Sequence, residues 1–89
     1  MQKIDEAIDR IRILECPTGD LQNRVTEILE SYGVADRNNV SINRDERFDR
    51  DEAQAYRIEI RGQEKTIIML AQSGYDDYVA KVMNVHNEL

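Results

Sequence analysis

Hydrophobic positions in the first third of the chain recur with the spacing of an α-helix. In residues 2–14 they form one stripe, made of Ile4, Ala7, Ile8, Ile11 and Leu14, and Ile13 points away from it. In residues 20–32 they form a second stripe, made of Leu21, Val25, Ile28, Leu29 and Tyr32. Pro17 lies between the two segments and cannot continue a helix. The short connection predicts an antiparallel helical hairpin, with Gly33 in the left-handed conformation just past its second helix.

The middle of the chain alternates between apolar and polar positions, which indicates β-strands. The clearest strand covers residues 54–61, and a turn at Gly62-Gln63 returns the chain as a second strand over residues 64–71. The residues that this turn sets opposite each other are Ile58 and Ile67, Tyr56 and Met69, and Arg61 and Glu64. Residues 39–48 alternate less regularly and are predicted as the first strand of the sheet, followed by a charged hairpin tip at residues 49–52.

Residues 74–88 return to helical spacing, and Ser73 and Asp76 are placed much as in a capping box. The apolar stripe of this predicted helix is wide and contains Tyr75, Tyr78, Val79, Val82, His86 and Leu89. Such a stripe can serve the core and an interface at once. The elements predict one α+β domain over residues 1–89, with a helical hairpin, a three-stranded antiparallel sheet and a C-terminal helix in the order α-α-β-β-β-α.

One face of the predicted strand pair carries both charged and large aliphatic side chains. Ile68 and Leu70 lie on it together with Arg57, Glu59 and Arg61. A face that meets only water would not hold two large aliphatic side chains on alternate positions. Either another element of the chain, such as the first helix, or a partner protein must therefore cover them.

Charge and size narrow the classes of function. The chain has 89 residues, 34% of them charged, and a net charge of −6 that lies mainly towards its two ends. A domain of this size supports one core and leaves little room for a deep substrate cavity. A net-negative chain also lacks the basic surface that binds nucleic acid or anionic membranes. With no long apolar run and no N-terminal targeting pattern, we expect a cytoplasmic protein, in the host cytoplasm if the source is viral.

No pattern of residues points to catalysis, a metal ion or a cofactor. The only histidine and the only cysteine, His86 and Cys16, fall on separate predicted elements, so they do not indicate a nucleophile with its base. A cluster of acids in the middle of the chain contains Asp45, Asp49, Asp51 and Glu52. It lacks the central glycine and the final glutamate of a calcium-binding loop, and neighbouring arginines repel a cation.

We therefore expect a non-enzymatic module that binds a protein with a basic surface and acts as a regulator or inhibitor. One version is a viral or mobile-element protein that blocks a nucleic-acid-binding host protein, with carboxylates in place of phosphates. The residues expected to meet the partner are Asp5, Glu6, Asp9, Glu27, Glu30, Asp49, Asp51, Glu52, Ile68, Leu70, Asp76 and Asp77. Two alternatives stay open: a structural or accessory protein that self-associates as a homodimer, and a binder of small anions such as nucleotides on Arg44, Arg57 and Arg61.

Overall fold

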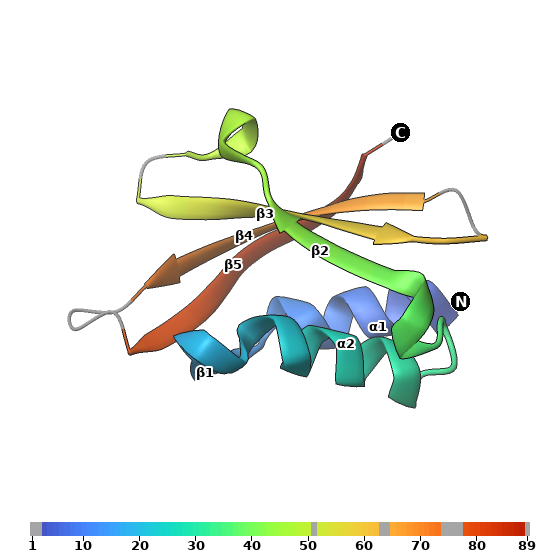
Figure 1. Ribbon diagram of the computed structural model, residues 1–89. Helices are drawn as coiled ribbons and strands as arrows, with labels where there is room; N and C mark the ends of the chain where they lie inside the picture. The colour runs from blue at the N-terminus through green and yellow to red at the C-terminus, as the bar shows by residue number, and fades with distance from the viewer. Residues whose placement is uncertain (1–2, 51, 63–64, 74–77, 89) are drawn as a thin grey trace.

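The computed structural model describes residues 3–50, 52–62, 65–73 and 78–88. Two helices, α1 (Lys3–Arg12) and α2 (Leu21–Ser31), pack on one face of an antiparallel sheet (Figure 1). The strands are β1 (Glu15–Pro17), β2 (Val40–Arg44), β3 (Ala53–Ile60), β4 (Lys65–Ser73) and β5 (Val79–Glu88). Short 3-10 helices are η1 (Thr18–Asp20), η2 (Arg37–Asn39) and η3 (Glu46–Phe48).

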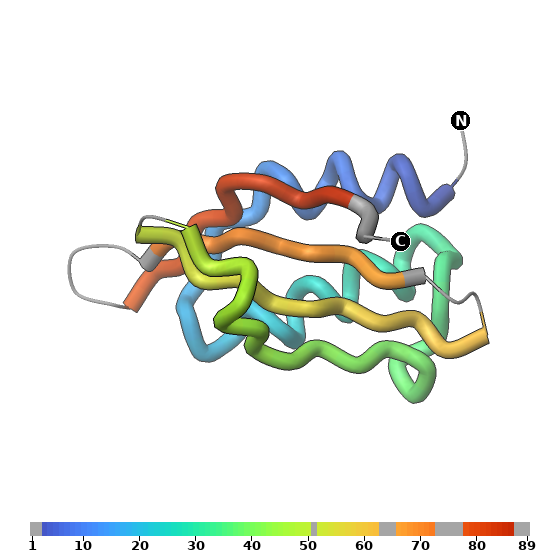
Figure 2. Tube along the Cα trace, turned by 90° about the horizontal axis from the view of Figure 1, so that it is seen from above, coloured from blue at the N-terminus to red at the C-terminus, as the bar shows by residue number. Residues whose placement is uncertain are grey.

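The strand order in the sheet is β1-β5-β4-β3-β2, so β1 and β2 form its two edges. Figure 2 looks onto the sheet and shows α1 beside β5, α2 behind the middle strands, and β2 outermost on the side away from α1. Neither helix in the described part of the chain is long and apolar enough to cross a membrane.

The main core lies between the helices and the sheet. The predicted stripe of α1 is buried there, and the stripe of α2 buries Leu21, Val25 and Leu29. Ile13 points into solvent, as its place outside the stripe predicts. Gly33 has a φ of +70°, which confirms the left-handed residue predicted after the second helix.

The central hairpin forms in the predicted register. Ile58 lies opposite Ile67, and Tyr56 lies opposite Met69, on the face that packs against the helices. Gly62 has a φ of +89°, a conformation that glycine adopts without strain and other residues rarely do. The predicted partner of Arg61, Glu64, lies outside the described residues.

The prediction of a C-terminal helix is wrong, and with it the prediction of a three-stranded sheet. Residues Val79–Glu88 form β5, which pairs with β4 along one side and with the unpredicted β1 along the other. The register of β4 and β5 shifts between Leu70 and Ala71, which leaves Met83 as an extra, bulged residue. Because of this bulge, Val82 and Val85 both face the helices although they are three residues apart. The bulge interrupts the two-residue alternation of a strand, whereas the stripe from Tyr75 to Leu89 matches helical spacing, and the segment was therefore predicted as a helix.

The strand predicted over residues 39–48 is also shorter than expected. It ends at Arg44, where the side chain of Asp45 accepts a hydrogen bond from the backbone N–H of Arg47 and so begins η3. Figure 1 shows η3 on the opposite side of the sheet from the two helices. The chain thus turns from the edge of the sheet onto its second face, called the far face below.

Candidate functional site

The far face of the sheet carries a small second core. Phe48 of η3 packs against Ala55, Ile68 and Leu70, and Ile68 and Leu70 are buried. The aliphatic side chains that needed a cover are therefore covered by another element of the same chain. That element is the segment around η3, on the face that α1 does not reach.

Two carboxylates hold η3 in this position. Asp45 accepts hydrogen bonds from Arg47 Nε at 2.9 Å and Nη2 at 2.8 Å, and from Arg57 Nε at 3.0 Å. Asp49 accepts from both terminal nitrogens of Arg44, at 2.8 and 3.0 Å, and from the backbone N–H of Ala55 at 2.7 Å. We call this group of Asp45, Arg47, Arg57, Arg44 and Asp49 the η3 clasp.

The electrostatics of the η3 clasp favour its charged form. Hydrogen bonds from Arg47 hold the pKa of Asp45 far below its usual range, with a further contribution from Arg57. The bond from Arg44 lowers the pKa of Asp49 in the same way. The guanidinium groups of Arg47 and Arg57 also lie 5.7 and 5.9 Å from the centre of the Phe48 ring. The same arginines that bind Asp45 therefore also contact Phe48, which covers the second core.

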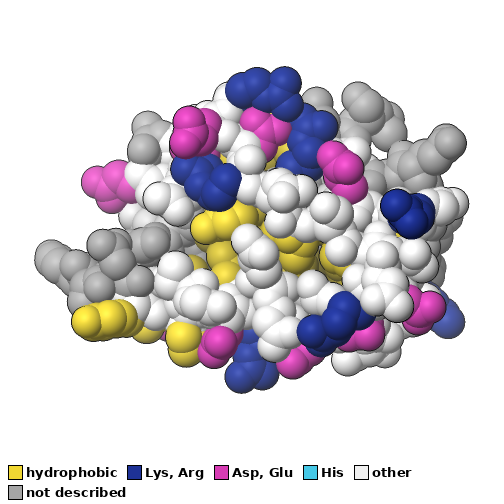
Figure 3. Space-filling model, viewed as in Figure 1, with side chains coloured by type: hydrophobic (Ala, Val, Ile, Leu, Met, Phe, Trp, Pro, Cys, Tyr) yellow, Lys and Arg dark blue, Asp and Glu magenta, His cyan; other side chains and the backbone are white. Residues whose placement is uncertain are grey.

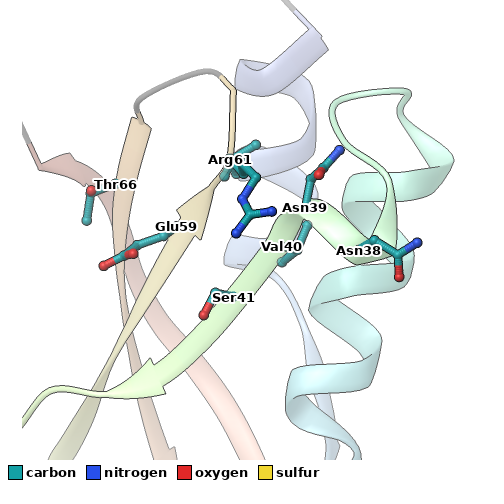
Figure 4. Close-up of a pocket in the computed structure, with 8 residues that line it drawn as sticks. Asn38, Asn39, Val40, Ser41, Glu59, Arg61 and Thr66 are labelled. Carbon is teal, nitrogen blue, oxygen red and sulfur yellow. The ribbon is translucent and has the colours of Figure 1, made fainter.

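The η3 clasp reduces the number of arginines on the sheet that are available to bind an anionic ligand. Two of the three that were considered for an anionic ligand, Arg44 and Arg57, already bind carboxylates of the chain. Arg61 forms no ion pair with any described residue and lines a pocket of about 520 Å³ at the end of β2 and β3 (Figure 4). Glu59, Asn38, Asn39, Ser41 and Thr66 also line it. One arginine beside one glutamate gives this pocket little net attraction for an anion.

Many of the acidic residues expected to meet a partner are paired within the chain. Ion pairs join Asp9 to Arg12 at 2.7 Å, Glu30 to Arg37 at 3.3 Å, and Glu27 to Arg24 at 3.6 Å, in addition to the pair between Asp49 and Arg44. Glu52 accepts a hydrogen bond from Gln72, whereas Asp5 and Glu6 of α1 are exposed and form no ion pair with a described residue. Asp51, Asp76 and Asp77 lie outside the described residues.

Four large apolar side chains are exposed, Ile13 just after α1 and the other three on or next to β5. Ile13 and Tyr78 are each 74% exposed, Met83 is 55% exposed and Val79 is 40% exposed. Ile13 precedes Leu14, whose carbonyl accepts a hydrogen bond from Val82, the neighbour of Met83. We call these four side chains the β5 patch.

Charged side chains of both signs border Ile13 on the α1 side. Ile13 also lines a shallow hollow together with Glu6, Asp9, Arg10 and Tyr32. Of the two carboxylates in the hollow, Asp9 pairs with Arg12 and Glu6 does not pair with a described residue. An apolar side chain thus borders an unpaired carboxylate on the surface.

The β5 edge of the sheet is closed by the chain itself as far as the carbonyl of Val85. β1 pairs with residues 79–81 of β5, and the carbonyl of Leu14 extends the pairing to the N–H of Val82. Beyond this point, Arg12 donates from Nε and Nη2 to the carbonyl of Val85, at 3.3 and 3.0 Å. Beyond the last backbone pairing at Val82, the Arg12 side chain therefore binds a further carbonyl on this edge.

The β2 edge has no such closure in the described part of the chain. Backbone hydrogen bonds from Arg61 to Asn39 and from Asp45 to Ala55 fix which residues of β2 point their N–H and C=O groups towards β3. In an antiparallel ladder these residues alternate. The N–H and C=O groups of Ser41 and Asn43 therefore point towards β3, and those of Ile42 and Arg44 point away from the sheet. No described residue binds the outward N–H and C=O groups of Ile42 and Arg44.

The side chains of β2 that face the helices are only partly covered. Val40 and Ile42 are half-buried and pack against the rim of the main core together with Tyr56 of β3. Figure 3 views the molecule with β2 in front. It shows apolar side chains in the middle of the surface, below a rim where positive and negative side chains alternate. The β2 edge thus combines unpaired backbone groups with an apolar strip.

The histidine and the cysteine lie on different faces of the sheet. His86 is half-buried on the far face, opposite Ile68 in the register of β4 and β5. Cys16 is buried in the main core, and burial raises the pKa of its thiol. The two side chains therefore cannot act as a nucleophile and its base.

No family model, curated protein or solved structure matches this chain. The residues that the sequence analysis missed are Ile13, Met83 and the outward backbone of β2. Ile13 had one signal, its place outside the stripe of α1. Met83 lies outside the stripe of the predicted C-terminal helix, and the free edge of β2 depends on a strand order that the sequence alone does not provide.

Proposed function

We propose that this protein is a non-enzymatic protein-binding module that contacts its partner through the β5 patch and the exposed carboxylates of Asp5 and Glu6 on α1. The observation that carries the proposal is the exposure of four large apolar side chains, one just after α1 and three on or next to β5. Patches of this kind on small proteins commonly mark interaction sites. In this reading the protein acts by occupying a surface of its partner, as a regulator or an inhibitor.

The charge of the chain suggests the chemistry of the partner. Asp5 and Glu6 have no ion-pairing residue among those described, and they lie on the same helix that ends beside Ile13. A partner with an apolar depression bordered by lysine or arginine would complement both features. A nucleic-acid-binding protein that is blocked by this surface is the more specific form of the same proposal.

The proposal is tested by comparing what the protein and two variants retain from a lysate of the cells that encode it. Met83→Glu combined with Tyr78→Ser places charge and polarity in the β5 patch. The partner should be retained by the unchanged protein and lost with this double variant, by at least about tenfold. Asn43→Asp adds the same charge at an exposed position of β2 and serves as the matched control, which should retain the partner.

Two results would contradict the proposal. One is a set of retained proteins that does not change between the double variant and the unchanged protein. The other is equal loss with Asn43→Asp, which would reveal a nonspecific effect of added negative charge. If the retained protein binds DNA or RNA, addition of that nucleic acid should release it, and failure to do so would limit the proposal to its general form.

A further inference from the structure

The β2 edge offers an incomplete set of hydrogen bonds with a defined geometry. Ile42 and Arg44 each direct an N–H and a C=O group away from the sheet. At Val40 only the C=O group is open, because its N–H donates to the carbonyl of Arg37. Unpaired edges of this kind are templates for the addition of another strand.

The side chains of β2 fit a second copy of the same strand. In an antiparallel pair centred on Ile42, each Ile42 lies opposite its copy, Val40 lies opposite Arg44, and Ser41 lies opposite Asn43. This register places the outward N–H groups of Ile42 and Arg44 opposite the outward C=O groups of Ile42 and Val40. On one face each Ile42 then meets its copy and Val40 lies opposite Arg44. On the other face small polar side chains meet, and no two like charges lie opposite each other.

We propose that two copies of the chain pair through β2 about a two-fold axis that passes beside Ile42. The two five-stranded sheets become one continuous sheet, and each β2 covers the apolar strip of the other. The contact is closed, because the same edge is used on both molecules and none is left over for a third.

Charge favours this edge over other surfaces for contact between two copies. Two chains of net charge −6 repel each other, but residues 36–61 carry seven acidic and six basic residues and are almost neutral. The one charged side chain of β2, Arg44, is already paired with Asp49 at 2.8 Å. The pairing also leaves the β5 patch free, so it does not depend on the proposed function.

The experiment measures the mass of the protein by sedimentation equilibrium and the exchange of its backbone amides at low and high concentration. As the dimer forms, the amides of Ile42 and Arg44 should become protected from exchange. The amides of Ser41 and Asn43 should be protected at both concentrations, because they bond within each chain. This contrast between neighbouring residues distinguishes pairing through β2 from association through another surface.

Substitutions at Ile42 sharpen the test. Ile42→Lys places two positive charges opposite each other across the axis and should weaken the dimer at least about tenfold, less so at high salt. Ile42→Pro removes the central N–H and should weaken it to a similar extent if the chain stays folded. Ile42→Val keeps both the N–H and a branched side chain, and its dimer should match that of the unchanged protein within about twofold.

Three outcomes would overturn the inference. The first is a protein that stays monomeric at millimolar concentration. The second is a dimer in which the amides of Ile42 and Arg44 exchange freely, which would place the contact elsewhere. The third is a dimer that the Ile42→Lys variant leaves intact. None of these outcomes affects the test of the β5 patch, because that test depends on Met83 and Tyr78.

Discussion

The two edges of the sheet differ in how their outward backbone groups are bound. Both expose backbone groups that could pair with another chain. At the β5 edge, β1, the carbonyl of Leu14 and the guanidinium of Arg12 bind these groups in succession as far as the carbonyl of Val85. At the β2 edge the flanking turns η2 and η3 limit the strand to five residues, and no described residue covers the groups that point outwards.

The comparison shows that closure of an edge depends on what the chain does just before and after the strand. α1 runs beside β5, and Arg12 in its last turn therefore reaches Val85. After β2 the chain turns away from the edge onto the far face, where the η3 clasp holds Phe48 over Ile68. The segment that could have covered the β2 edge is used to cover the second core.

The largest expected effect comes from proline at neighbouring positions of β2. Asn43→Pro removes an N–H that points towards β3 and should lower the free energy of unfolding by about 3 kcal/mol. Ile42→Pro removes an N–H that points outwards and should cost only about 1 kcal/mol, mainly through the lost contacts of the side chain. Urea denaturation at a concentration below that of any dimer gives both values. Equal effects would mean that the assignment of inward and outward residues is wrong.

The next largest effect is expected at Phe48, which follows β2 and covers the second core. Phe48→Ala should lower the free energy of unfolding by about 2 kcal/mol, because it removes the apolar cover of Ile68 and Leu70. Phe48→Leu keeps most of the buried area and should cost less than about 1 kcal/mol. Thermal or urea denaturation checks both variants. If Phe48→Ala is as stable as the unchanged protein, the far face does not need this cover.

A smaller effect is expected at the closed edge. Arg12→Met keeps an apolar side chain but removes the bonds to Val85, and it should cost about 1 kcal/mol. It should also increase light scattering at high concentration, since it opens a second edge. Arg24→Met removes an exposed arginine with only a 3.6 Å ion pair and should change stability by less than about 0.5 kcal/mol. A difference between the two variants that is absent or reversed would argue against closure by Arg12.

The smallest effect is expected between pH 8 and pH 5, where the contribution of the η3 clasp to the free energy of unfolding should not change. The pKa values of Asp45 and Asp49 are lowered in the folded chain, so their contribution to stability is complete above the unfolded value of about 3.9. It is lost as the pH falls below about 4 through the folded values. Denaturation at pH 7, 5 and 3 checks this, with Asp45→Asn combined with Asp49→Asn as the variant that should lose less on acidification. Loss of stability already near pH 6 would point to another group.

The sequence predicted the parts of this fold that depend on regular spacing. The stripes of α1 and α2, the left-handed Gly33 and the register of Ile58 with Ile67 follow from local periodicity, and all of them are present. β5 was missed because the apolar residues from Tyr75 to Leu89 match helical spacing, and the bulge at Met83 interrupts the two-residue alternation that would have indicated a strand.

Less of the candidate site could be predicted, because it depends on tertiary structure. The composition showed that acids were numerous, but not that Asp9, Glu27 and Glu30 would pair with arginines. The need for a cover over Ile68 and Leu70 was visible in the sequence, but its source was not. Phe48 follows a strand that ends earlier than alternation suggested, and only the turn at Asp45 brings it back over the sheet.

The bulge at Met83 has a consequence for changes in chain length. The extra residue is absorbed locally, so Asn84 and Val85 keep the faces that an uninterrupted strand without Met83 would give them. Deletion of Met83 should therefore be tolerated by the core, and it would straighten β5. The surplus residue follows directly after Val82, the last residue of β5 that bonds to the segment before it in the sheet order, so the bulge marks where strand pairing on this edge ends.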